Sequence, residues 1–284
     1  MSGSIVVLGA AGQLGADLLK CLGPRAVPMT HADADVRDPA SLARAIPTGA
    51  AWVINGAAFH DVDKCEDDAA TAFAVNAIGA LNVARAAAAV GAGVTFISTD
   101  YVFDGTLTRP YREDDRTAPL NVYGASKLAG EQLTRQGNPR ALVARTSYLY
   151  GRRPAAGKGN LVTGILGAAR RGDTLRVARE VVFSPTYTAH LAARLVALAD
   201  RQTTGVVHVA NAGATTREEF TRFVLDAAGV AAPVALISVA ELPWKARRPL
   251  YSVLASDADA RLGLGPMPDW RAAIKEYLDP GEAR

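Results

Sequence analysis

The segment that decides the fold of this chain is Ile5-Val6-Val7-Leu8-Gly9-Ala10-Ala11-Gly12-Gln13-Leu14-Gly15. Its four apolar residues predict a buried strand, and the glycines that follow open a helix. Glycines in that context let the backbone approach a pyrophosphate at a helix N-terminus. The spacing is G-x-x-G-x-x-G rather than G-x-G-x-x-G, and a merely tight strand-to-helix turn is the plain alternative. We interpret the segment as a dinucleotide-binding loop with cofactor contacts from Gly9, Gly12, Gln13, Leu14 and Gly15.

Short apolar runs alternate with alanine-rich helical segments through the first half of the chain. This alternation is typical of a parallel sheet covered by helices on both faces. Asp38 before Pro39 predicts a helix start, and Gly91 is expected to end a helix over 76–90. The expected strands lie at 5–8, 26–29, 52–55, 94–98 and 141–144. The predicted fold class is therefore α/β, a doubly wound parallel sheet of the Rossmann type.

The regular alternation of apolar runs and helical segments ends after Gly151, which suggests two domains. We assign residues 1–150 to a dinucleotide-binding domain and 151–284 mainly to a smaller, mixed α/β substrate domain. A helix at 161–171, another at about 187–200 and a strand at 206–209 are expected there, and the helix at 187–200 is expected to pack back on the first domain. Since we find no repeat, low-complexity tract or free linker, the second region should pack on the first.

Composition bounds the class of protein. The 284 residues are 49% hydrophobic, and 31 basic and 28 acidic residues are interspersed to give a net charge of +3. Such a balance indicates neither a nucleic-acid nor a membrane partner. Cys21 and Cys65 lack paired spacing, which favours a reducing, cytoplasmic location and two buried thiols. The histidines lack the spacing of metal ligands, so no metal site is expected. The start of the chain carries no basic leader of an export signal.

Tyr123 and Lys127 are four residues apart and share one face if their segment is helical. A nearby ammonium favours a phenolate, so Lys127 is expected to lower the Tyr123 pKa from its usual value of about 10. Tyr123 could then supply the proton that a carbonyl takes up when hydride reduces it, and Thr99 could hold the carbonyl oxygen. We predict Thr99, Tyr123 and Lys127 as catalytic residues. For an isolated Y-x-x-x-K match, an amphipathic surface helix is the plain alternative.

The end of the second predicted strand bears on the choice of cofactor. An acidic residue there would grip a ribose 2′-hydroxyl, but the chain has Thr30-His31 instead. NADPH is therefore permitted, with His31 or Arg37 as candidate aids, and NADH is not excluded. Asp35 and Val36 follow at a place suited to flank an adenine ring.

Taken together, the motifs resemble the extended short-chain dehydrogenase/reductases and, within them, the dTDP-4-dehydrorhamnose reductase family. The likeness covers nearly the whole chain. Besides the glycine loop it rests on 53–58 (VINGAA), 62–66 (VDKCE), 75–77 (VNA), 98–103 (STDYVF), 118–124 (APLNVYG), 145–148 (RTSY), 157–160 (GKGN), 184–186 (SPT) and 248–249 (RP). The resemblance implies an extended short-chain dehydrogenase fold and reduction of the 4-keto group of a dTDP-4-keto-6-deoxyhexose by NADPH.

The resemblance also implies roles for particular residues. Thr99, Tyr123 and Lys127 form the catalytic set of the family. The matched segments add cofactor contacts from Ala57 and Ala58, and substrate contacts from Val62, Asp100, Tyr101 and Tyr148, the last standing where many members carry tryptophan. A nucleotide diphosphate needs cations, for which Lys158, Arg247 and Arg248 are candidates, and we predict substrate contacts from Lys158 and Arg248. Phe59-His60-Asp61 depart from the family pattern, which leaves the exact sugar open.

Other functions remain open at this point. A reductase or epimerase for another nucleotide sugar would use the same apparatus, since pocket identity depends on loops. A non-catalytic NADP-binding regulatory subunit is the alternative from a different class, although Thr99, Tyr123 and Lys127 are all present. A nucleotide sugar is the expected small-molecule partner, and a homodimer is left open.

Overall fold

The computed structural model describes residues 3–153 and 159–279 of the chain. Its main layer is a six-stranded parallel sheet with the order β10-β5-β4-β3-β1-β2. The strands are β1 (Ile5–Leu8), β2 (Ala26–Met29), β3 (Trp52–Asn55), β4 (Gly93–Thr99), β5 (Ala141–Thr146) and β10 (Gly205–His208). The order reverses between β1 and β3, because the chain adds β2 on one side of β1 and then crosses to the other side.

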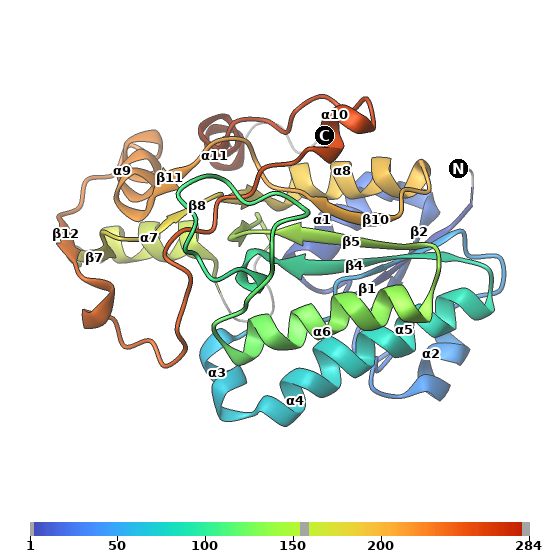
Figure 1. Cartoon of the computed structure of the whole chain (residues 1–284). Coiled ribbons are helices and arrows are strands. Elements are labelled where there is room, and N and C mark those ends of the chain that lie inside the picture. Colours follow the sequence, from blue (N-terminus) through green and yellow to red (C-terminus); the bar gives the residue numbers. More distant parts are fainter. Residues whose placement is uncertain (1–2, 154–158, 280–284) are drawn as a thin grey trace.

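Helices cover both faces of this sheet, which confirms the doubly wound fold (Figure 1). One face carries α1 (Gln13–Leu22) and α8 (Thr188–Asp200), which pack against each other. The other face carries α2 (Pro39–Ala45), α5 (Gly79–Ala89) and α6 (Val122–Gly137). Before α5 the chain forms α3 (Val62–Asp67), α4 (Ala69–Phe73) and one π-helical turn, η2 (Ala74–Ile78).

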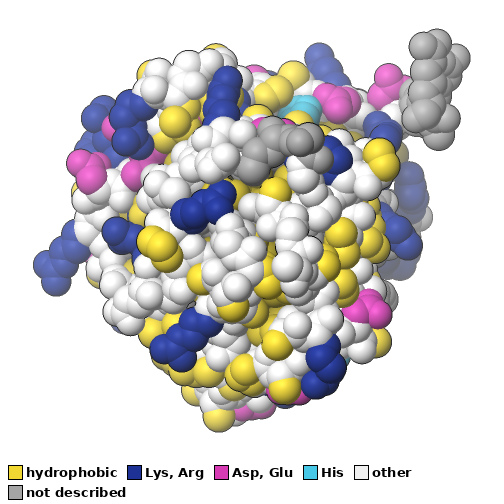
Figure 2. Space-filling model, turned by 90° about the vertical axis from the view of Figure 1, so that its right-hand side faces the viewer, with side chains coloured by type: hydrophobic (Ala, Val, Ile, Leu, Met, Phe, Trp, Pro, Cys, Tyr) yellow, Lys and Arg dark blue, Asp and Glu magenta, His cyan; other side chains and the backbone are white. Residues whose placement is uncertain are grey.

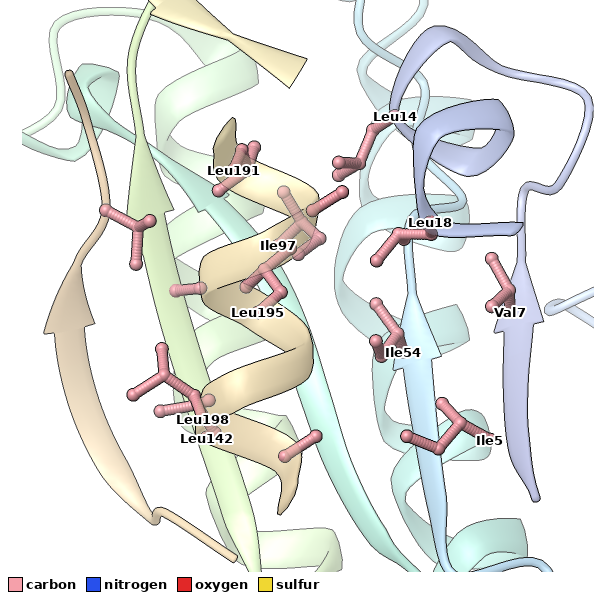
Figure 3. Packing of buried hydrophobic residues seen from close by; sticks show 14 of the residues in the cluster. Ile5, Val7, Leu14, Leu18, Ile54, Ile97, Leu142, Leu191, Leu195 and Leu198 are labelled. Carbon is pink, nitrogen blue, oxygen red and sulfur yellow. The ribbon is translucent and has the colours of Figure 1, made fainter. Parts of the chain in front are cut away.

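Alternate residues of each strand enter opposite cores, as the pleat of a strand requires. Ile5 and Val7 of β1 join the cluster under α1 and α8, whereas Val6 and Leu8 join the cluster under α2 and α5. Figure 3 shows the first cluster, which combines side chains of α8 and α1 with side chains of β1, β3, β4, β5 and β10. Both faces are buried, which explains why the strands read as continuous apolar runs rather than alternating ones.

The expected strands at 5–8, 26–29 and 52–55 match β1, β2 and β3. The strands β4 and β5 run past their predicted ends to Thr99 and Thr146. Asp38 caps α2 by accepting a hydrogen bond from the Ala40 amide, with Pro39 at the first helical position, as predicted. The expectation for Cys21 was wrong: it is exposed, because it lies outside the buried stripe of α1.

The second region packs on one end of the sheet and is built from short paired strands and three of the described helices (Figure 1). Its strand pairs are β6 (Leu149–Tyr150) with β9 (Thr186–Tyr187), β7 (Leu175–Ala178) with β12 (Val234–Ile237), and β8 (Val182–Phe183) with β11 (Thr215–Thr216). The helices are α7 (Leu161–Arg170), α9 (Arg217–Ala227) and α11 (Trp270–Leu278), whereas α10 (Ala258–Arg261) lies beside α8 with Ala258 in the core under α8. Three short 3₁₀ turns complete the described chain: η1 (Gly23–Arg25), η3 (Asp100–Val102) and η4 (Val239–Glu241).

Two elements from beyond residue 150 return to the sheet. The strand β10 pairs with β5 in parallel register, with Val206 opposite Val143, and so becomes an edge strand of the main layer. The helix α8 places Leu191, Leu195 and Leu198 in the core under α1. The two regions are therefore not divided at a single position in the sequence, because β10 and α8 come after residue 150 but belong to the main sheet and its helices.

The charged side chains of the surface and one long apolar helical run are two further features of the fold. Figure 2 shows the face at the amino ends of the strands, where lysine and arginine side chains are dispersed and acidic side chains lie between several of them. The helical run Ala69–Ala89 is long and apolar enough, by length and composition alone, to cross a membrane, and 44% of its most apolar window is buried in the fold. That run comprises α4, η2 and α5, which contact α6 and α2.

The packing under α8 predicts a large cost for truncating a central leucine. Leu195 is fully buried in this core, so Leu195→Ala should lower the free energy of unfolding by about 2 to 5 kcal/mol. Chemical denaturation followed by far-UV circular dichroism measures this loss. Leu236→Ala is the matched control, because Leu236 is 41% exposed on β12 and its loss should cost about 0.5 kcal/mol. Equal losses in the two variants would contradict this description of the core.

Candidate active site

A cavity of about 340 Å³ opens at the carboxyl ends of the strands, where open parallel sheets bind ligands. It lies at the point where the strand order reverses, so its wall combines the loop after β1 with residues that follow β3, β4 and β5. Most of the predicted site residues line it: Gly9, Gly12, Gln13, Leu14, Gly15, Ala58, Val62, Thr99, Asp100, Tyr101, Tyr123, Lys127 and Tyr148. Segments far apart in the sequence thus share one cavity.

The glycine loop is built for close approach of its backbone. Gly9 has φ of +79°, a conformation that glycine adopts without strain, and its amide donates to the Met29 carbonyl at 3.0 Å. A Cβ on Gly15 would lie 2.4 Å from the Gly9 oxygen, so only glycine fits where α1 meets the loop. The helix begins after Gly12, which offers no capping side chain, and the first amides of α1 therefore face the cavity as an anion site.

Gln13 ties this loop to the second region. Its Oε1 accepts hydrogen bonds from the Gly151 amide at 3.0 Å and from Asn160 Nδ2 at 3.1 Å. Asn160 in turn caps α7 by accepting from the Thr163 amide at 3.0 Å. One side chain of the dinucleotide loop is therefore connected to the helix that begins the second region.

Thr99 ends β4, Asp100 begins the turn η3 that follows it, and both are buried against the cavity. The Thr99 hydroxyl donates to Asp100 Oδ1 at 3.1 Å and accepts from the Tyr101 amide at 3.2 Å. Ser147 donates to the other carboxylate oxygen of Asp100 at 2.9 Å. Burial raises the pKa of Asp100 to about 6, while the hydrogen bonds from neighbouring hydroxyls oppose the shift. Asp100 can therefore change protonation near neutral pH.

Tyr123 and Lys127 lie on the same face of α6 and both line the cavity, as their spacing predicted. The expected effect of Lys127 on Tyr123 is not what the structure shows. Burial raises the pKa of the Tyr123 phenol well above its ordinary value, and a hydrogen bond with Thr99 opposes that shift. Lys127 is 2% exposed with its Nζ 4.1 Å from the centroid of the Phe96 ring, and burial lowers its own pKa to about 7. Desolvation outweighs charge attraction here, because both groups are away from water.

Tyr148 forms a wall of the cavity in a strained backbone conformation. Its φ of +42° is rare for a residue other than glycine. Its hydroxyl shares a hydrogen bond of 3.1 Å with the hydroxyl of Tyr101, and its ring lies 4.3 Å from the ring of Phe183. The Arg217 guanidinium sits 4.7 Å from the centre of the Tyr148 ring. These contacts hold the two phenols as a polar edge of the cavity.

The end of β2, where the adenosine part of the cofactor is expected, differs from the prediction in one respect. Asp33 Oδ2 accepts from the Thr30 amide at 2.8 Å and from the Thr30 hydroxyl at 2.7 Å, so a carboxylate does lie at the end of β2. The sequence did not reveal this, because Asp33 approaches Thr30 only through a turn. Asp35 is paired with Arg37 at 2.7 Å, which lowers the Asp35 pKa to about 2. Asp35, Val36 and Ala57 do not line the cavity, although Val36 is buried nearby under α5.

Only some of the basic residues predicted to bind a nucleotide diphosphate lie within the described part of the chain. Lys158 lies outside the described residues. Arg248 donates to Asp63 at 2.8 Å and lies 4.3 Å from the ring of Trp244. Two other arginines, which the sequence did not indicate, line a second cavity of about 330 Å³ together with Arg248 and Trp244: Arg176 and Arg217. Because they come from β7 and α9, only the folded second region brings them beside Arg248.

Asn76 lies buried within the π turn before α5. Its side chain exchanges two hydrogen bonds of 2.9 Å with the backbone of Phe59, and its Nδ2 donates to Ser126 Oγ at 3.0 Å. It therefore supports the loop after β3 and the first turns of α6. Among the described residues, no group of three or more histidine, cysteine, aspartate or glutamate side chains is placed to hold a metal ion.

The buried phenol yields a prediction about titration. Because burial raises its pKa, Tyr123 should stay protonated when exposed tyrosines ionise near pH 10. The absorbance at 295 nm of the ligand-free protein and of Tyr123→Phe should then follow the same titration curve up to about pH 10.5. A step near pH 7 or 8 that Tyr123→Phe removes would instead restore the view that Lys127 depresses the phenol pKa.

Comparison with known proteins agrees with this geometry. The family described as the RmlD substrate binding domain matches residues 3–282. The dTDP-4-dehydrorhamnose reductase of Mycolicibacterium smegmatis is 39% identical over 286 residues, which cover 98% of this chain and 86% of the relative. Nearly the full length of the chain is therefore similar to that enzyme.

Two crystal structures have the same fold with a TM-score of 0.91. One is a dTDP-4-dehydrorhamnose reductase from Clostridium acetobutylicum, with 33% identity over 97% of this chain and 98% of that one. The other is the dTDP-4-dehydrorhamnose reductase of Bacillus anthracis in complex with NADP, with 32% identity over 98% of this chain and 99% of that one. The fold around the cavity is thus that of these relatives.

Proposed function

The chain belongs to the dTDP-4-dehydrorhamnose reductase family, and we propose that it reduces the 4-keto group of dTDP-4-dehydrorhamnose with NADPH to give dTDP-L-rhamnose. The observation that carries the proposal is the single cavity shared by the glycine loop and by Thr99, Tyr123 and Lys127. A reductase needs a cofactor site and a proton donor within reach of one another, and the two meet in this cavity.

The residues present fit a dinucleotide. Gly9 packs its backbone against Gly56 and Gly15 packs against Gly9, where a Cβ would clash, and the uncapped start of α1 offers amides to a pyrophosphate. Gly9, Gly12, Gln13, Leu14 and Gly15 would hold that part of the cofactor, with Ala57 and Ala58 beside them and Asp35 and Val36 toward the adenine. Bound NADPH supplies the hydride that the reduction requires.

Tyr123 is the proton donor in this proposal. Burial keeps the proton on its phenol, so the hydroxyl can donate to the 4-oxygen of the sugar as negative charge develops there. Thr99 adds a second hydroxyl that orients the same oxygen. The Lys127 ammonium, held within the cavity wall, favours the phenolate that Tyr123 becomes after it has given up its proton.

The rest of the substrate would extend from this point toward the second region. Val62, Asp100, Tyr101 and Tyr148 would contact the sugar, since all four line the cavity. Arg248 and the neighbouring Arg217 and Arg176 would neutralise the diphosphate, and Lys158 is a further candidate. We also propose a cytoplasmic location, in agreement with the two free cysteines, whereas a homodimer stays a prediction.

Turnover of the named substrate tests the proposal. The purified protein should oxidise NADPH when given dTDP-4-dehydrorhamnose, and more slowly with other 4-keto sugar nucleotides. Tyr123→Phe should lower kcat by ~10²- to 10⁴-fold while the Kd of NADPH stays nearly unchanged, since only the transferable proton is lost. Tyr251→Phe is the control and should keep full activity, because Tyr251 lies outside the cavity. Binding of NADPH without turnover of any sugar nucleotide would favour the regulatory-subunit alternative.

Cofactor preference gives a second test. NADPH should be accepted at least as well as NADH, and Thr30→Asp should shift the kcat/KM ratio toward NADH, because a second carboxylate would repel a 2′-phosphate. Asp33→Asn should shift the ratio toward NADPH by removing the carboxylate that Thr30 now holds. Asp68→Asn is the matched control, since Asp68 caps α4 through Thr71 and lies away from β2. A ratio that Asp33→Asn leaves unchanged would contradict the placement of the ribose at this turn.

A further inference from the structure

A buried carboxylate lies directly behind the candidate active site. Glu131 is on α6, one helical turn after Lys127, and only 4% of it is exposed. Its Oε1 accepts from Ser98 Oγ at 2.6 Å and from Arg145 Nε at 2.9 Å, and its Oε2 accepts from Arg145 Nη2 at 2.8 Å. Both oxygens of the carboxylate are thus satisfied by two neighbouring strands.

Of the two partners of Glu131, Ser98 lines the cavity and Arg145 directly precedes the lining residue Thr146. Ser98 of β4 pairs with Arg145 of β5, and the next pair along the same strands is Thr99 with Thr146. Glu131 therefore joins α6, which carries Tyr123 and Lys127, to the ends of both strands at the cavity. It does so at the position where the helix faces both strands at once.

Stability alone gives little reason for a charge at this place. An ion pair loses its hydration on burial, and apolar residues of similar volume often stabilise a core as well or better. The helix is also held closely without it, since a Cβ on Gly130 would lie 2.1 Å from the Asn76 carbonyl oxygen. A buried, bidentate pair does offer directional contacts that fix one arrangement of helix and strands.

We propose that Glu131 is a positioning residue of the reductase site, whose carboxylate fixes Tyr123 and Lys127 on α6 relative to Thr99 on β4. The inference rests on the proposed function, because that function makes this distance matter for proton donation. Glu131 acts through the residues it holds and does not itself line the cavity.

Glu131 also acts on the charge of Lys127. Burial lowers the pKa of Lys127 to about 7, and the negative charge of Glu131 opposes that shift. Loss of the charge would lower the Lys127 pKa further, so Lys127 would give up its proton at a lower pH. The other charged or titratable groups around this pair are Arg145 from β5, Glu113 and His208 behind it, and Tyr123 and Asp100 on the cavity side.

Two variants distinguish the effect of the length of the Glu131 side chain from the effect of its charge. Glu131→Gln keeps the length of the side chain and loses the charge, so kcat should fall by ~10-fold or more. Because the Lys127 pKa should also fall, the alkaline limb of the pH-rate profile should move to lower pH by about one unit. Glu131→Asp keeps the charge and withdraws the carboxylate, so kcat should fall, by up to ~10²-fold, with the alkaline limb nearly in place. The Kd of NADPH should change little in either variant.

A matched ion pair controls for a general loss of stability. Asp259→Asn breaks the pair of Asp259 with Arg194, whose side chains are 17% and 11% exposed and which lies away from the cavity. This variant should lower the melting temperature and leave kcat and the pH-rate profile as in the unmodified protein. Ser98→Ala removes one donor to Glu131 without a change of charge, and should lower kcat only a few-fold with the alkaline limb fixed.

The readouts distinguish the possible failures. If the unmodified protein does not turn over the substrate, the proposed function fails, and the ¹³C NMR titration of Lys127, assigned with Lys127→Met, still tests whether Glu131→Gln lowers the Lys127 pKa. A Glu131→Gln protein with unchanged kcat and an unmoved alkaline limb overturns the inference. So does a pair of Glu131 variants that lose NADPH binding and native circular dichroism together, since Glu131 would then serve the fold alone.

Discussion

The crossing of the chain from β2 over β1 to β3 is the constraint on which the site depends. Parallel strands end at one edge of a sheet, and neighbouring loops are directed apart where the strand order reverses. The glycine loop after β1 therefore has open space beside it, and the residues that follow β3 and β4 border the same space. A cavity at this place needs no special cleft-forming loop. It follows from the order in which the strands are added.

Burial then decides the chemistry of the groups around that space. The sheet is apolar on both faces, so a polar residue at its carboxyl edge is removed from water on several sides. This raises the pKa of Tyr123 and of Asp100 and lowers that of Lys127, all toward the neutral form. Hydrogen bonds from the same neighbourhood oppose part of the shift. A neutral phenol and a carboxyl and amine that titrate near neutrality are suited to a site that transfers one proton.

The sequence was sufficient for what depends on local pattern. The first strands, the cap at Asp38 and the shared helix face of Tyr123 and Lys127 follow from periodicity, capping residues and spacing, and the family resemblance grouped Thr99 with that pair. It was not sufficient for what depends on distant partners. The return of β10 to the sheet, the Glu131–Arg145 pair and the approach of Arg217 to the second cavity arise only after segments far apart in the chain are packed together. The direction of the Tyr123 shift was wrong because spacing reports a neighbouring charge but not the loss of water.

The central claim is that one cavity holds cofactor and sugar so that Tyr123 and Thr99 meet the reacting oxygen. A crystal structure of the complex with NADP⁺ and dTDP-L-rhamnose tests it most directly. The account predicts the 4-hydroxyl oxygen of the sugar within about 3.2 Å of both Tyr123 Oη and Thr99 Oγ1, with the diphosphate toward Arg248. A sugar bound with its 4-hydroxyl away from Tyr123, or outside the cavity altogether, would contradict the account.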